Sequence, residues 1–78
     1  MQNKYVKLSI NYHIPNDLSN IIDEYVVFLN TGEGIADDYY RTEIQMILNW
    51  CFREHKLSDK QIKELRDYYQ EGGIKKIG

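Results

Sequence analysis

The segment Tyr5–Ile14, YVKLSINYHI, alternates strictly between two kinds of side chain. The apolar kind occupies the even positions, which are Val6, Leu8, Ile10, Tyr12 and Ile14. Groups able to hydrogen-bond occupy the odd positions, which are Tyr5, Lys7, Ser9, Asn11 and His13. Because successive side chains of a strand point to opposite faces, the pattern predicts one strand with an apolar and a polar face. The strand needs a backbone partner, which is a second copy of the chain, the tail Ile74–Ile77 or a foreign sheet.

Three helices are expected after the strand, and two of them have clear boundary residues. The first begins at Asn16 or Asp17, because short oxygen-bearing side chains favour the N-cap, and ends at Gly32, which tolerates a left-handed conformation. The third begins at Ser58, whose hydroxyl forms a capping box with Gln61. The sequence thus predicts a mostly helical α+β fold, one N-terminal strand and three helices, in a single domain of residues 1–78.

The second helix is expected to begin near Asp37 or Asp38 and carries two apolar stripes. Its main stripe is Tyr40, Ile44, Ile47, Leu48 and Cys51. Its second stripe is Tyr39, Met46 and Trp50. A helix that is apolar on two sides is either central in the fold or shared with a partner. We expect the second stripe to form an interface, since Tyr and Trp are enriched among interface anchors, with local packing of the rings as the alternative.

Size and cysteine content restrict the class of protein. A 78-residue chain supports only a small core, and with Cys51 as its single cysteine it forms no internal disulfide, so oligomerisation is the remaining source of stability. An unpaired cysteine and the lack of a long apolar run favour a cytoplasmic protein without a membrane segment. Cys51 and His55 are too few for a zinc site, so a buried structural cysteine is expected. No phosphate loop or nucleophile motif is present, and we predict neither an enzyme nor a cofactor.

The formal net charge of −2 is unevenly distributed. Residues 1–15 carry Lys4, Lys7 and no acid, whereas residues 16–43 carry seven acids against Arg41, a net charge of −6. Non-specific nucleic-acid binding normally requires a strongly basic face, so this distribution argues against it. It permits a specific DNA reader whose basic groups lie on one small surface.

The order of strand, proline, helix, glycine turn and second buried helix resembles the ribbon-helix-helix family of Arc/MetJ-type DNA-binding proteins. The resemblance covers Val6–Leu57, including Tyr40-Arg41-Thr42-Glu43-Ile44 before Ile47-Leu48, and leaves Ser58–Gly78 as an additional helix and tail. In that family two protomers pair their strands into an antiparallel ribbon whose outward residues read the major groove. The family's phosphate contact at the second helix is not carried over, because Asp37-Asp38 places negative charge there.

The resemblance implies a homodimer bound to double-stranded DNA. The implied DNA-binding residues are Lys4, Lys7, Ser9, Asn11 and His13. The expected dimer interface is Val6, Leu8, Ile10, Tyr39, Met46 and Trp50. The leading expectation is therefore a small dimeric transcriptional repressor or accessory factor that binds a specific sequence.

The same residues also fit two alternatives. The polar face of the strand is equally typical of the solvated side of an ordinary edge strand. The alternative function is a small acidic protein-interaction module that binds a larger protein and inhibits or assists it. The acidic segment 16–43, the spare aromatic side chains and an edge strand able to join a partner's sheet support this alternative.

Overall fold

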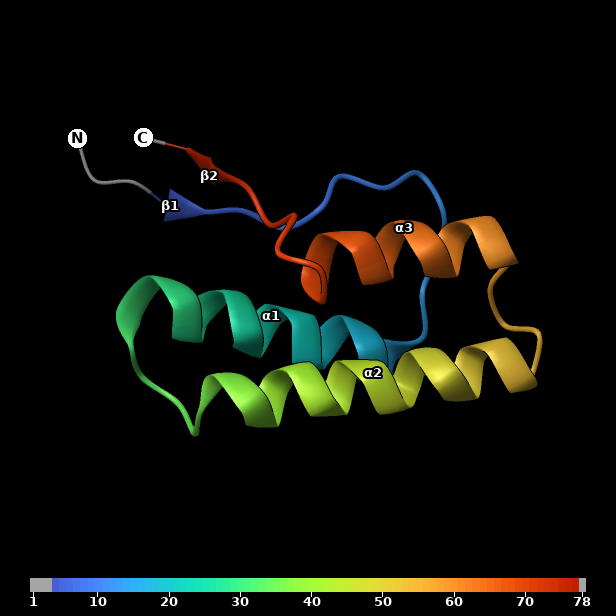
Figure 1. Ribbon diagram of the computed structural model, residues 1–78, viewed down its shortest axis with the longest axis horizontal. Helices are drawn as coiled ribbons and strands as arrows, with labels where there is room; N and C mark the ends of the chain where they lie inside the picture. The colour runs from blue at the N-terminus through green and yellow to red at the C-terminus, as the bar shows by residue number, and fades with distance from the viewer. Residues whose placement is uncertain (1–3, 78) are drawn as a thin grey trace.

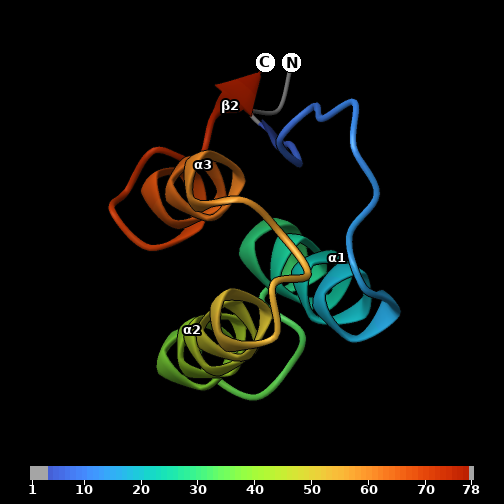
Figure 2. The ribbon, with the colours of Figure 1, turned by 90° about the vertical axis from the view of Figure 1, so that its right-hand side faces the viewer.

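The structure is a computed structural model that describes residues 4–77. In chain order the elements are β1 (Lys4–Tyr5), α1 (Asn16–Thr31), α2 (Asp37–Arg53), α3 (Asp59–Tyr69) and β2 (Lys76–Ile77). The helix α2 packs against both α1 and α3, and the two terminal segments meet at one end of the molecule (Figure 1). Viewed end-on, the three helices occupy the corners of a triangle (Figure 2). The predicted small, mostly helical α+β fold is confirmed.

The helix boundaries follow local signals. Gly32 adopts φ 76°, and its N–H donates to the carbonyl oxygen of Phe28 at 2.8 Å, which closes α1 as predicted. The capping box of α3 is also present, with the Gln61 N–H donating to Ser58 Oγ at 3.1 Å and the Ser58 N–H donating to Gln61 Oε1 at 3.0 Å. The expected side-chain cap of α1 is wrong, because Pro15 occupies the N-cap and makes no such bond.

The core is a single cluster formed by all three helices. Its members are Leu18, Ile21, Ile22, Tyr25, Tyr40, Ile44, Leu48, Cys51, Leu57, Ile62, Leu65, Tyr68 and Tyr69. Four of the five residues of the main α2 stripe are buried here, and the fifth, Ile47, is partly buried against the cluster. The buried main stripe and the packing of α2 on both α1 and α3 fit a central place for this helix, one of the two alternatives left open by the sequence.

The predicted strand Tyr5–Ile14 is wrong in its extent. The ladder covers only Lys4–Tyr5, which pairs antiparallel with β2 in the register Lys4 to Ile77 and Tyr5 to Lys76. The C-terminal tail is thus the partner found within the chain. The predicted alternation is correct, because the odd positions from 7 to 13 are exposed while the even positions from 6 to 14 are half-buried. We call residues 6–14 the strap.

Side chains bond the backbone of Tyr5 at the end of β1 and of the first strap residues, where the Val6 N–H still donates to the carbonyl oxygen of Lys75 at 3.1 Å. The Asn30 side chain on α1 bonds both backbone groups of Tyr5, accepting from its N–H at 2.7 Å and donating to its carbonyl oxygen at 3.0 Å. The Tyr68 hydroxyl donates to the carbonyl oxygen of Val6 at 2.6 Å. The Tyr69 hydroxyl accepts from the Leu8 N–H at 3.0 Å. These bonds satisfy backbone groups that a ladder would otherwise use, which explains why the strand ends early.

Candidate functional site

The second stripe of α2 is open to solvent. Tyr39, Met46 and Trp50 are 39%, 59% and 40% exposed, while the main stripe of the same helix faces the core. Positions separated by seven and eleven residues fall on one side of a helix with 3.6 residues per turn. The sequence therefore predicted correctly that these three side chains share a face outside the core of their own chain. Their role as a dimer interface stays a prediction.

Two of the stripe's rings contact neighbouring side chains. The Tyr39 ring meets Tyr40 edge-on, with 5.1 Å between ring centroids and 78° between ring planes. The Lys56 ammonium lies 5.8 Å from the centroid of the Trp50 ring, within the range of a cation–π contact. Both rings thus have a neighbour within the chain, as the alternative of local packing expects, although each ring residue remains about 40% exposed.

Charge differs between the two ends of this helix. Asp37 and Asp38 lie in its first turn and Arg53 in its last. Asp37 also accepts a hydrogen bond from the Tyr25 hydroxyl at 2.8 Å, and burial together with this bond raises the pKa of Tyr25 to about 12. The second stripe therefore runs from an acidic to a basic end.

Four further apolar side chains are exposed, and none of them is among the candidate site residues predicted from the sequence. These are Val27, Ile35, Phe52 and Ile77. Phe52 lies on α2 but belongs to neither stripe, so its position in the helical repeat gave no signal. Ile35 lies in the connection before α2, where helical periodicity gives no information.

The polar face of the strap is exposed as expected, at Lys7, Ser9, Asn11 and His13. Lys4 is exposed at the joined termini, where Lys76 lies over the Tyr5 ring with its Nζ 4.9 Å from the ring centroid. The three apolar strap positions assigned to a dimer interface, Val6, Leu8 and Ile10, are half-buried within the chain, and Leu8 packs on the core cluster.

Lys7 has a partner that the sequence did not reveal. Its Nζ lies 2.7 Å from Asp23 Oδ1 of α1, and both side chains are about half exposed. An ion pair of this kind reduces the charge that Lys7 offers to a DNA phosphate. Asp23 stands sixteen residues away in sequence, so no local pattern predicts the pair.

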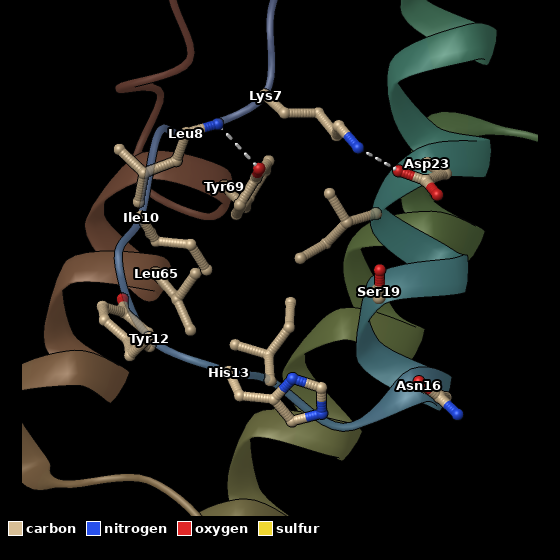
Figure 3. Close-up of a pocket in the computed structure, with 12 residues that line it drawn as sticks. Lys7, Leu8, Ile10, Tyr12, His13, Asn16, Ser19, Asp23, Leu65 and Tyr69 are labelled. Carbon is tan, nitrogen blue, oxygen red and sulfur yellow. Dashed lines mark hydrogen bonds and ion pairs between the residues drawn. The ribbon is translucent and has the colours of Figure 1, made fainter.

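A cavity of about 250 Å³ lies between the strap, α1 and α3. The Lys7–Asp23 ion pair stands at one side of it, and His13 and Asn16 stand at the other (Figure 3). Its apolar lining is Leu8, Ile10, Ile14, Ile22 and Leu65. Ser19 also lines the cavity, but within residues 4–77 no hydrogen bond links it to His13 or Asp23, so these three groups do not form the bonded relay that activates a serine.

Outside the cavity, the one cysteine of the chain is buried. Burial raises the pKa of the Cys51 thiol, which keeps the sulfur protonated and poorly nucleophilic. The predicted structural cysteine is therefore buried as expected. Among the described residues, no group of three or more His, Cys, Asp or Glu side chains is placed to hold a metal ion.

No family model matches this chain, and neither the curated proteins nor the solved structures contain a match. Within the part of the chain that is described, no helix has both the length and the apolar character needed to cross a membrane.

Proposed function

We propose that this chain is a small protein-interaction module that docks on a larger protein through the second stripe of α2. The observation that carries the proposal is the joint exposure of Tyr39, Met46 and Trp50 on a helix whose main stripe is buried in the core. Aromatic residues and Met are enriched in the cores of protein interfaces, and a few such anchors supply most of the binding energy.

The stripe defines the shape of the partner's surface. Tyr39 and Trp50 are eleven residues apart, so a rise of 1.5 Å per residue places them roughly 16 Å apart along the helix. A helix of this kind docks by laying its apolar side into a groove. Glu43 lies between Tyr39 and Met46 along the chain, and the first turn of α2 carries Asp37 and Asp38. We therefore expect an apolar groove with basic residues beside the N-terminal end of α2.

Photo-crosslinking in cells tests this proposal without knowledge of the partner. A photoreactive phenylalanine analogue at position 46 lies in the stripe, and the same analogue at the exposed position 60 of α3 is the matched control. We expect one dominant adduct with a larger protein from position 46 and none from position 60. Equal labelling from both positions, or an adduct of twice the chain mass alone, would contradict docking on a larger protein.

Sequence-specific DNA binding remains the second candidate. It is favoured by the exposure of Lys7, Ser9, Asn11 and His13 on one face of the strap. Three further lysines, Lys4, Lys75 and Lys76, are exposed at the joined termini. Two contacts count against DNA binding. The ion pair with Asp23 engages the Lys7 ammonium that would contact DNA, and the pairing with β2 engages backbone groups of Lys4–Tyr5 that could pair with a second copy.

Selection of bound duplexes from a random pool, followed by fluorescence anisotropy of the selected duplex over a salt series, tests the DNA proposal. DNA binding predicts that Lys7→Ala reduces the slope of log affinity against log salt by about 1, because one phosphate contact is lost. Lys63→Ala on α3, which removes an equally short ion pair with Asp67, should leave the slope unchanged. Equal slopes for both variants, or no binding at low salt, would overturn this candidate.

A further inference from the structure

We propose that the cavity beneath the strap binds a small zwitterion with an aliphatic chain, which is the chemistry of a free aliphatic α-amino acid. The proposal is independent of the second stripe, which lies on α2, whereas the cavity is lined by the strap, α1 and α3.

The size of the cavity limits the ligand. A cavity of about 150 Å³ lined by aliphatic and aromatic side chains is known to hold benzene. The volume here is about 250 Å³, which leaves room for a branched aliphatic chain and the two charged groups at its end. Larger ligands would have to extend into solvent.

The lining indicates an aliphatic rather than a polar chain. Five aliphatic side chains line the cavity, from the strap, α1 and α3. Two tyrosines also line it, but their hydroxyls already bond elsewhere. Tyr12 donates to Glu64 Oε1 at 2.8 Å, and Tyr69 accepts from the Leu8 N–H at 3.0 Å. Each hydroxyl thus has one bond within the chain, and the five aliphatic side chains supply the apolar contact for the ligand's chain, while the polar groups His13, Asn16 and Ser19 lie elsewhere in the lining.

The Lys7–Asp23 ion pair supplies charges of both signs at the side of the cavity (Figure 3). A lysine ammonium has three N–H donors and uses one of them for Asp23 Oδ1. A ligand carboxylate placed against Lys7 and a ligand ammonium placed against Asp23 complete a square of alternating charges, and the existing pair stays intact. A carboxylic acid without the amine meets the Asp23 charge unmatched, and an amine without the carboxylate meets Lys7 in the same way.

Few polar contacts tie the part of the strap that borders the cavity to the helices. In residues 7–14, the backbone makes one described hydrogen bond to the helices, in which the Leu8 N–H donates to the Tyr69 hydroxyl. Side chains at the two sides of the cavity, Lys7 and Tyr12, make the other hydrogen bonds of this segment. The exposed ion pair contributes little to stability, and the strap is held mainly by Leu8, Tyr12 and Ile14, which pack on the core cluster.

Two-dimensional ¹H–¹⁵N NMR titration tests the proposal with four probes. The first probe is L-leucine. The other three each lack one of its groups: 4-methylpentanoate lacks the amine, 3-methylbutylamine lacks the carboxylate, and glycine lacks the aliphatic chain. We expect leucine to shift the backbone amides of Leu8, Ile10, Ser19 and Asp23 saturably. Each of the other probes should bind at least about tenfold more weakly than leucine, because each lacks one charged or apolar contact.

Two matched variants assign the binding to the ion pair. Asp23→Asn is expected to weaken leucine binding about tenfold, since the charge that holds the ligand ammonium is gone. Asp67→Asn is the control, because Asp67 also forms a 2.7 Å ion pair with a lysine but lies outside the cavity. The proposal is overturned by no saturable shift with leucine, by equal affinities for the four probes, or by equal losses in the two variants.

Discussion

The Tyr68 hydroxyl holds both terminal segments, and its removal has a predictable cost. It donates to the carbonyl oxygen of Val6 at 2.6 Å and accepts from the Lys75 N–H at 3.0 Å, while the ring is buried in the core. Each hydrogen bond contributes about 0.5–1.5 kcal/mol to the free energy of unfolding, so Tyr68→Phe should lower it by about 1–3 kcal/mol. For a chain of 78 residues the total is about 4–12 kcal/mol, so this is a substantial share.

Urea unfolding followed by circular dichroism measures the loss, and amide hydrogen exchange locates it. We expect the Lys75 amide to exchange faster in Tyr68→Phe, because its acceptor is gone. Tyr39→Phe is the matched control, since it removes a hydroxyl from an exposed ring and should change the free energy of unfolding by under about 0.5 kcal/mol. A Tyr68→Phe variant as stable as the control, or a Lys75 amide already unprotected in the parent chain, would refute the role assigned to this hydroxyl.

Four further predictions concern stability and reactivity. Asn30→Ala removes both side-chain bonds to the Tyr5 backbone and, at this exposed site, should lower the free energy of unfolding in urea by about 1 kcal/mol. Ser58→Ala removes the N-cap of α3 and should also cost about 1 kcal/mol in the same assay. The pKa of Tyr25 is raised from 10 to about 12 in the folded chain, so the protonated hydroxyl contributes fully to the free energy of unfolding below pH 10, and this contribution is lost as the pH rises towards 12. The urea midpoint should therefore fall between pH 10 and 12, and it should fall less in Tyr25→Phe. Cys51 should react with a thiol reagent at the rate of unfolding or local opening, as shown by a large acceleration in urea.

Local features of the fold could be predicted from the sequence. The capping box of Ser58 and Gln61 and the turn at Gly32 depend on residues within one helical turn, and both are found where predicted. The two stripes of α2 were also separated correctly, because helical periodicity alone assigns their faces. These signals involve short-range geometry and need no knowledge of the tertiary arrangement.

The rest depends on contacts between distant parts of the chain. Alternation assigned the two faces of the strap, but the length of the ladder is determined by β2 and by the hydroxyls of Tyr68 and Tyr69, about sixty residues away. The partner of Lys7 and the cavity beside it likewise arise only when the strap, α1 and α3 come together. No periodic pattern in the sequence encodes such contacts.

We propose above that the second stripe of α2 docks on a larger protein. The most direct test is the affinity of the protein captured at position 46, measured by calorimetry for the parent chain, Trp50→Ala and Lys63→Ala. An aromatic anchor at the centre of an interface contributes about 2 kcal/mol or more, so we predict that Trp50→Ala weakens binding by about 30-fold or more. Lys63→Ala, on α3, should leave the affinity unchanged. Equal affinities for Trp50→Ala and the parent chain would contradict the claim.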